Sequence, residues 1–297
     1  MSQTVSPSVH RPYGLARVCR VWEVPRSTVY ATQARQATPP RPPQRRGPKP
    51  QWSDETLLDE IRAVLAASPF LGEGHRKVWA RLRWQGVRTS KARGLRLMRQ
   101  AHLLAPTRAG HRHGPKAHDG TITTDRPDQM WGMEATSGLT RREGTATLVV
   151  VVDHCAAECL DIHAAKPGTR FEALEPLRQG VHAVFGGYAA GVATGLQARH
   201  DHGSQYMSDA FQAEWRFLGI ESSPAFVREP EGNGVAERFI RTLKEQVLWV
   251  RTFDTVEDLR LALREFKARD NREWLMERHG HQTPAAVRAQ WPQRKAA

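Results

Sequence analysis

Cysteine is scarce in this chain of 297 residues, which has only three: Cys19, Cys155 and Cys159. An odd and sparse set of cysteines excludes the disulfide framework of a small secreted protein. Cys155 and Cys159 have two histidines near them in the sequence, but no zinc-ligand spacing matches. We therefore expect buried structural cysteines in preference to metal ligands.

Long apolar runs are also missing. No stretch approaches the roughly 18 apolar residues of a membrane span. The start Met1-Ser-Gln-Thr-Val-Ser-Pro has no apolar core of a signal peptide. The hydrophobic content of 39% and the charged content of 25% are ordinary for a globular protein, and the length allows two or three domains. These observations predict an intracellular protein without a membrane partner.

Acidic residues are in deficit, with 31 Asp and Glu against 44 Lys and Arg, a net charge of +13. The excess is one-sided, because residues 1–120 hold 22 basic against 7 acidic residues, whereas residues 121–297 hold 22 against 24. This distribution favours a polyanionic partner that binds the first third of the chain. A charge excess that only improves solubility is the weaker alternative.

Two short helices are predicted within residues 1–36, where Leu15, Val18 and Cys19 have helical spacing and Pro25 marks a break. Two such helices with a tight turn are typical of a helix-turn-helix, whose second helix can enter the major groove of DNA. A plain helical hairpin is the alternative. The candidate DNA contacts in this segment are Arg17, Arg20 and Arg26.

A linker rich in proline and arginine follows at residues 37–52, because proline disfavours helix and central strand. Residues 53–110 predict a second helical, helix-turn-helix-like domain, with apolar residues at helical spacing and a third helix near residues 91–101. Its candidate DNA contacts are Arg88, Lys91, Arg93 and Arg96, although basic residues also occur on solvated helix faces. A second linker is expected at residues 111–124, where His111, His113 and His118 lack supporting metal ligands.

Residues 125–297 predict a mixed α/β domain. The stretch 144–153 is nearly continuously apolar and β-branched, as expected of a strand that is covered on both faces. Extended segments at 128–136 and 157–163 flank it, and a helix at 170–185 follows. The order is completed by a short strand before Asp201, a helix over 208–218, a short extended run at 220–225, and a helix whose start is marked by Asn233 and flanking glycines. This order matches a ribonuclease-H-like fold.

Three carboxylates are candidates for one site: Asp201 after the short strand, Glu237 in the last of these helices, and Glu134 in the first extended segment. Hard cations such as Mg²⁺ take oxygen ligands, and two cations about 3.5–4 Å apart can clamp a phosphoryl displacement. Asp153 also ends a buried strand, but a capping or turn role is favoured for it. Arg241 and Lys244 share a helical face with Glu237 and are candidates for phosphate contact, against the alternative of a solvated ion pair.

Three motifs carry a family resemblance: Trp131…Glu134…Thr136, then His200-Asp201-His202-Gly203-Ser204-Gln205-Tyr206, then Asn233…Glu237. They resemble the Asp-Asp-Glu motifs of second-frame (OrfB) transposases of bacterial insertion sequences, which are relatives of retroviral integrases. The resemblance extends from about residue 54 to residue 287. It departs at one position, because Glu134 stands where the family has aspartate.

The resemblance implies a metal-dependent DNA transposase that cleaves and joins DNA strands. Its catalytic and metal-binding residues would be Glu134, Asp201 and Glu237, with two Mg²⁺ or Mn²⁺ ions. Its partners would be double-stranded DNA at the element ends and target, a homo-oligomer on that DNA, and a first-frame (OrfA) protein, in the nucleoid of a bacterial cytoplasm. The alternatives are a transposase-derived DNA-binding protein impaired by Glu134, and a nuclease that cuts without joining.

Overall fold

The computed structural model describes residues 3–37, 51–106, 122, 124–166, 169–201, 203–225 and 233–292. Two compact units are present, residues 1–51 and residues 52–297, and each is described by itself. Nearly all of the linkers expected at 37–52 and 111–124 lies outside the described residues, as do His111, His113, His118 and His202. None of the described helices is both long and apolar enough to cross a membrane.

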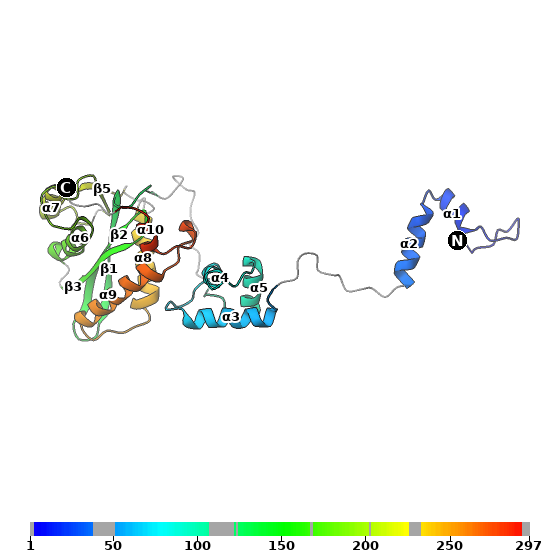
Figure 1. Cartoon of the computed structure of the whole chain (residues 1–297), viewed down its shortest axis with the longest axis horizontal. Helices are drawn as coiled ribbons and strands as arrows, with labels where there is room; N and C mark the ends of the chain where they lie inside the picture. The colour runs from blue at the N-terminus through cyan, green and yellow to red at the C-terminus, as the bar shows by residue number, and fades with distance from the viewer. Residues whose placement is uncertain are drawn as a thin grey trace. The chain divides into compact units, whose positions relative to one another are not determined.

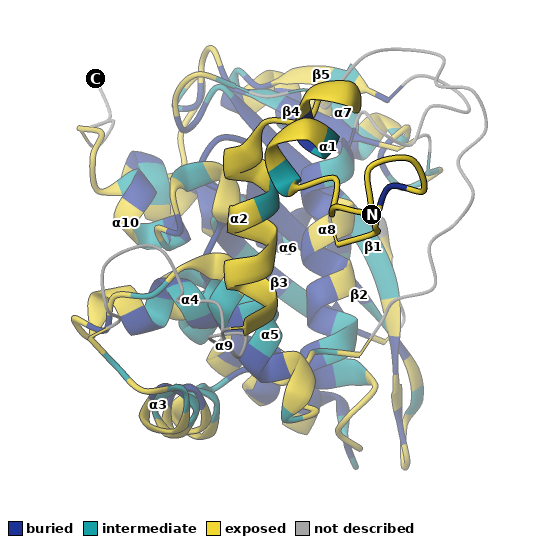
Figure 2. Cartoon of the chain, turned by 90° about the vertical axis from the view of Figure 1, so that its right-hand side faces the viewer, coloured by how far each residue is buried: buried dark blue, intermediate teal, exposed yellow. Residues whose placement is uncertain are grey.

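The first unit contains the two short helices that the sequence predicts, α1 (Leu15–Val21) and α2 (Arg26–Ala37). Gly14 precedes α1 with a φ of 71°, a left-handed conformation that suits glycine. Cys19 is the buried residue of α1, and α2 has none. Figure 2 accordingly shows α2 exposed along its length.

The second unit begins with three helices, α3 (Asp54–Ala67), α4 (His75–Trp84) and α5 (Lys91–Gln100). Ser53 and Ser90 cap α3 and α5, because each side chain accepts a backbone N–H from the first turn. The helices share one apolar cluster, as their three- and four-residue spacing of apolar residues predicts. Its buried members are Leu57, Ile61, Val64, Val78, Leu82, Val87, Leu97 and Met98.

A five-stranded mixed sheet follows, in the order β3-β2-β1-β4-β5 (Figure 1). Its strands are β1 (Met130–Thr140), β2 (Gly144–Asp153), β3 (Cys159–Ala165), β4 (Gln197–His200) and β5 (Glu221–Pro224). The first three strands are antiparallel, whereas β4 is parallel to β1 and β5 is parallel to β4. The third strand begins later than residue 157, where the sequence places its start, and Ala157 has a left-handed φ of 51°.

Helices cover both faces of this sheet. Helices α6 (Arg170–Phe185) and α7 (Asp209–Leu218) lie on one face, and α8 (Gly234–Leu243) and α9 (Val256–Glu273) lie on the other (Figure 1). Alternate residues of β2 pack on opposite faces, Val149 and Val151 towards α6, and Val150 and Val152 towards α8 and α9. The strand is therefore buried on both sides, and the expected ribonuclease-H-like fold class, a mixed sheet flanked by helices, is confirmed.

The three N-terminal helices of this unit are hydrogen-bonded to its α/β part. The π-helix η2 (Lys244–Leu248) follows α8, and the side-chain amide of its Gln246 forms two bonds with the backbone of Leu71. Gln246 accepts the Leu71 N–H at 2.8 Å and donates to the Leu71 carbonyl at 2.9 Å. Phe70 also packs edge-on against Trp274, with ring centroids 4.9 Å apart.

The end of the chain is held by a buried ion-pair cluster. After the short 3₁₀ helix η3 (Glu277–His279), α10 (Pro284–Arg288) presents Arg288 to three carboxylates. The Arg288 guanidinium donates to Asp128 at 2.9 and 3.0 Å and also to Glu158, and it lies 3.7 Å from Asp153. Asp128 in turn accepts the indole N–H of Trp131. The last helix is thereby fastened to the start of β1 and the end of β2.

Candidate active site

Glu134 and Asp201 are brought together by the parallel pairing of β1 with β4. The paired residues are Met130 with Gln197, Trp131 with Ala198 and Gly132 with Arg199. Glu134 lies two residues after Gly132, and Asp201 lies two residues after Arg199. Because parallel neighbours run in step, these two carboxylates lie at the same level of the sheet, beside the C-terminal end of β4.

Glu237 approaches the same place from the first turn of α8. This helix packs on the face of β1 that carries Glu134, with Ala236 against Gly132. A carboxylate in the first turn is favoured by the positive end of the helix dipole. Glu237 is exposed as a residue, although partial desolvation of its carboxyl raises its pKa.

The electrostatics of Glu134 show that the three carboxylates are neighbours. Burial and then the negative charge of Asp201 raise the pKa of Glu134 to about 7, with a smaller contribution from Glu237. A hydrogen bond from Asn233 acts in the opposite direction. A carboxyl that is pushed this far from its ordinary value is a functional-site candidate, because repulsion of this kind is relieved by a bound cation.

Asp201 follows β4 in an exposed turn that glycine permits. Its carboxylate Oδ1 accepts the backbone N–H of Gly203 at 2.8 Å. A Cβ at residue 203 would lie only 2.8 Å from that oxygen, so any larger residue would displace the carboxylate. The glycine of this motif therefore has a local reason to be there.

Asn233 stands at the N-cap position of α8, where the sequence places the start of the helix. Its side chain makes no bond to the first turn of the helix. Its Nδ2 group donates instead to the carbonyl of Met133 at 2.8 Å and to Oε2 of Glu134 at 2.9 Å. The asparagine thus joins the helix that carries Glu237 to the strand that carries Glu134.

Asp153, the fourth acidic candidate, has the turn role that the sequence favoured. It is fully buried, and its two oxygens accept the backbone N–H groups of Ala156 and Asp128 at 2.6 and 2.8 Å. These bonds fix the turn after β2. Arg288 also lies 3.7 Å from this carboxylate, so all of these contacts of Asp153 stabilise the fold.

The donor set fits a hard divalent cation by its chemistry, since carboxylate oxygens from three separate elements converge and repel one another. Glu134, Asp201 and Glu237 are the residues that would hold it. As the side chains stand, no three His, Cys, Asp or Glu residues in the described part of the chain form a closed metal-binding cluster. A cation would therefore draw neighbouring carboxylates together.

Two of the basic residues predicted to contact DNA are engaged within the protein. Arg93 donates to Oδ1 of Asp54 at 2.8 and 2.6 Å and to the carbonyl of Trp52, and Arg96 donates to Oδ2 of Asp54 at 2.6 Å. These two side chains bind α5 to the start of α3. The hydrogen bonds from Arg96 and Arg93 lower the pKa of Asp54.

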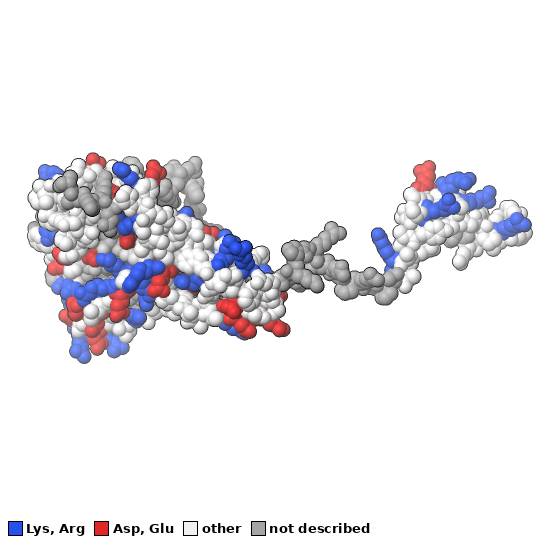
Figure 3. Space-filling view, viewed as in Figure 1, with Lys and Arg blue, Asp and Glu red and all other residues white. Residues whose placement is uncertain are grey.

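The other basic candidates lie on the surface of their units. Arg17, Arg20 and Arg26 are exposed in the first unit, and Figure 3 shows blue side chains prevailing on its visible face. Arg88 is exposed, and Lys91 lies with its Nζ 4.6 Å from the centre of the Trp79 ring. Arg241 is exposed and paired with Glu245 at 3.2 Å, and Lys244 is half-buried at the start of η2.

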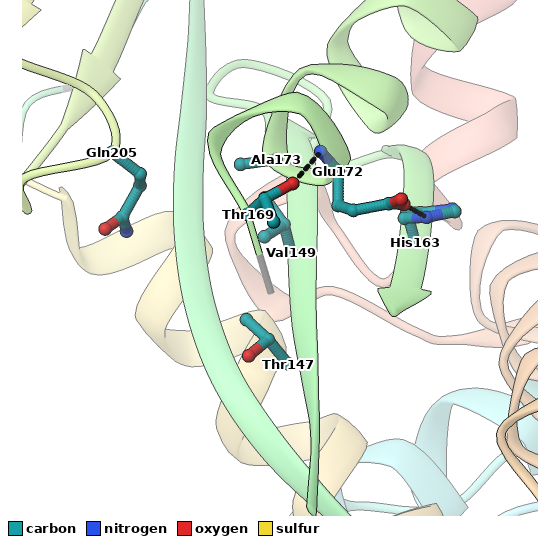
Figure 4. Close-up of a pocket in the computed structure, with 7 residues that line it drawn as sticks. All are labelled: Thr147, Val149, His163, Thr169, Glu172, Ala173 and Gln205. Atoms are coloured by element: carbon teal, nitrogen blue, oxygen red, sulfur yellow. Dashed lines mark hydrogen bonds and ion pairs between the residues drawn. The ribbon is translucent and has the colours of Figure 1, made fainter. Parts of the chain in front are cut away.

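A separate small cavity of about 190 Å³ lies on the other face of the sheet, beneath α6 (Figure 4). Its wall includes His163 of β3, which lies 2.6 Å from the Glu172 carboxylate. Thr169 caps α6 by accepting the N–H of Glu172 at 3.4 Å. His163, Thr169 and Glu172 are thus paired with one another in this cavity.

Comparisons with known proteins give relatives for most of the chain, although no protein-family model matches. A 48.2 kDa protein of insertion element IS2A from Escherichia coli is 26% identical over 250 residues, which are 82% of this chain and 57% of that protein. The transposase InsD of E. coli IS2 elements is 27% identical over 209 residues, which are 68% of each chain. The chain therefore spans little more than half of the first of these relatives.

Solved structures with a related arrangement come from retroviruses. The simian T-cell lymphotropic virus intasome has a TM-score of 0.45 and 18% identity, and covers 74% of each chain. The HTLV-2 integrase catalytic core domain in complex with magnesium has a TM-score of 0.41 and 18% identity, and covers 55% of this chain and 98% of that one. The similarity to the InsD transposase confirms the resemblance of this chain to insertion-sequence transposases.

Proposed function

We propose that this chain is a DNA transposase that cleaves DNA strands and joins them to a target. The observation that carries the proposal is that Asp201 and Glu237 lie near Glu134 beside the end of β4, which is reflected in the raised pKa of Glu134. The similarity to InsD transposases supports the same activity. The substrate is double-stranded DNA, at the ends of the element and at the target.

Each carboxylate has one task in this proposal, which is to hold Mg²⁺ or Mn²⁺, with two ions in the site. When bound, such ions polarise the attacking water or 3′-hydroxyl and neutralise charge on the phosphate. The residues themselves supply position. Glu134 is set by β1 and Asn233, Asp201 by its turn with Gly203, and Glu237 by α8. Ser204 has no role as a nucleophile.

The domains divide the work. We propose that residues 1–36 and 53–110 bind DNA, that residues 125–297 form the catalytic core, and that residues 37–52 and 111–124 link them. The basic excess of residues 1–120 supports this division. A homo-oligomer on DNA and a first-frame partner belong to the same proposal, since two element ends must be handled together.

The experiment uses the full chain, a labelled duplex carrying the ends of its element, and supercoiled target plasmid, with Mg²⁺ or with EDTA. We expect nicked ends and joined products with Mg²⁺, and neither with EDTA. Nicks without joined products would show a nuclease instead. Binding without any nick, in both Mg²⁺ and Mn²⁺, would show a DNA-binding protein impaired at Glu134.

A further inference from the structure

The side-chain amide of Asn233 has a fixed orientation. Asn233 is 2% exposed, and its Nδ2 group lies 2.8 Å from the Met133 carbonyl and 2.9 Å from Glu134 Oε2. A carbonyl and a carboxylate can only accept, so the nitrogen of the amide must face them. Oδ1 must therefore point to the other side, away from Glu134.

On that other side, Oδ1 meets Gly132 and His154. A Cβ at residue 132 would lie 2.7 Å from Asn233 Oδ1, 2.8 Å from His154 Nε2 and 3.1 Å from the Ala236 Cβ. No side chain fits in this space, so glycine allows the two polar groups to come close to one another. Among the described residues, Asn233 Oδ1 and both ring nitrogens of His154 are buried and have no hydrogen bond within ordinary geometry.

His154 has the chemistry to complement that oxygen. It is 1% exposed, and burial lowers its pKa to about 4, so its ring is neutral at pH 7. Interactions with the Ile122 backbone and the Asn233 side chain act in the opposite direction on this pKa. A neutral imidazole carries one N–H donor, and the space beside Gly132 brings Asn233 Oδ1, which is an acceptor, near His154 Nε2.

We propose that His154, Asn233 and Glu134 form a buried polar chain that orients the Glu134 carboxylate for a divalent cation. His154 fixes the Asn233 amide, the amide holds Oε2 of Glu134, and the second oxygen of Glu134 is left for the cation. His154 and Asn233 are positioning residues, and Gly132 supplies the space in which they meet. This inference rests on the proposed function.

Holding the carboxylate by this polar chain matters more because residue 134 is glutamate and not aspartate. Glutamate has one more rotatable bond than aspartate, and its carboxylate is about 1 Å further from the strand. A displacement of that size can cost about 100-fold in rate. A hydrogen bond from a rigid, buried amide removes this freedom.

The test measures Mn²⁺ affinity of the full chain by calorimetry without DNA, together with the thermal unfolding midpoint of each variant. Partners that orient metal ligands typically contribute about 10–100-fold to metal affinity. We expect Asn233→Leu and His154→Leu to bind Mn²⁺ about 10–100-fold more weakly. His154→Gln keeps an N–H donor, and we expect it to recover most of the affinity that His154→Leu loses.

Two further variants allow a conclusion even if one of these buried substitutions impairs folding. Gly132→Ala leaves every polar group in place, but its Cβ separates Asn233 from His154, and we expect about a 10-fold loss of affinity. His163→Gln is the matched control, since His163 is a histidine of the same sheet that pairs with Glu172 on the other face. It should bind Mn²⁺ as the parent does.

Parent-like Mn²⁺ affinity in Asn233→Leu, Gly132→Ala and His154→Leu would overturn the inference, provided that Asp201→Asn loses binding. Equal Mn²⁺ affinity of the parent and Asp201→Asn would overturn the proposed metal site itself. It would also remove the role proposed for His154 and Asn233. A loss of affinity in His154→Leu that His154→Gln does not recover would also contradict the role of the N–H donor. Loss in the three variants with recovery by His154→Gln supports it.

Discussion

At the scale of single residues, burial shifts the pKa values of two titratable side chains close to β1, Glu134 and His154. His154 gives a pH effect that one substitution can isolate. Its pKa of about 4 in the folded chain is depressed from an ordinary value near 6.5. The unfolded chain therefore binds a proton more readily, and the contribution of His154 to stability is complete above pH 6.5 and is lost as the pH falls towards 4.

We expect His154→Gln, which cannot titrate, to lack this dependence. The difference in unfolding free energy between the parent and His154→Gln should change by about 3 kcal/mol between pH 7 and pH 4, to the disadvantage of the parent. Denaturant unfolding of both proteins at several pH values measures this. Comparing the two cancels carboxyls such as Glu134, whose raised pKa acts in the opposite direction. A difference that does not change with pH would contradict a buried neutral histidine.

Sequence patterns suggest the acidic residues of the proposed site but not the residues that contact them. Asp201 and Glu237 belong to specific motifs, and Glu134 was located by its spacing from Trp131. Asn233 marks the start of a helix in the sequence, and it does stand at the N-cap position of α8. Nothing local in the sequence shows that its amide bonds across to β1, since that contact depends on how α8 packs on the sheet.

At the scale of elements, the fold depends on a few contacts between segments that are distant in sequence. Alternation and β-branched composition predicted the strands of the sheet. The order β3-β2-β1-β4-β5 was expected only as part of a fold class, since strand pairing follows from packing. The two hydrogen bonds of Gln246 with Leu71 and the ion pairs of Arg288 had no signal in the sequence, because each joins residues more than 100 positions apart.

The Arg288 cluster gives a prediction at this scale. Arg288→Met leaves Asp153, whose side chain is fully buried, and Asp128, whose side chain is 7% exposed, without their cation. Removing one partner of a buried pair costs about 3–5 kcal/mol. We expect a loss of that order in the free energy of unfolding at pH 7, measured by denaturant titration.

The matched control is Arg264→Met on α9. Arg264 is paired with Glu257 at 3.0 Å, but both side chains are about 60% exposed. Solvent weakens such a pair, so we expect a change within about 0.5 kcal/mol. Similar losses in both variants would contradict the view that the Arg288 cluster holds the last helix in place.

At the scale of the whole molecule, the excess of positive charge is concentrated in residues 1–120. Residues 1–51 alone hold 9 Lys and Arg against one acidic residue, Glu23. Each phosphate contact adds about 0.9 to the slope of log affinity against log salt concentration for duplex DNA. A full chain with Arg17, Arg20 and Arg26 replaced by glutamine should therefore lose up to about three units of slope.

Duplex binding at several salt concentrations measures this slope. The control is a full chain with Arg62→Gln, because Arg62 lies on α3 and is paired with Asp59 at 3.2 Å. It should keep the parent slope. An unchanged slope in the triple variant would remove the first two helices from the DNA interface.

The central claim is that Asp201, with Glu134 and Glu237, holds the cations that drive strand cleavage. The most direct measurement is Mg²⁺-dependent nicking of labelled element ends by Asp201→Asn beside the parent protein. Asp201 is exposed, so the substitution should leave folding and duplex binding unchanged, and both are measured in parallel. We predict that Asp201→Asn binds the ends as the parent does and that nicking is lost. Nicking at the parent rate by a folded Asp201→Asn protein would contradict the account.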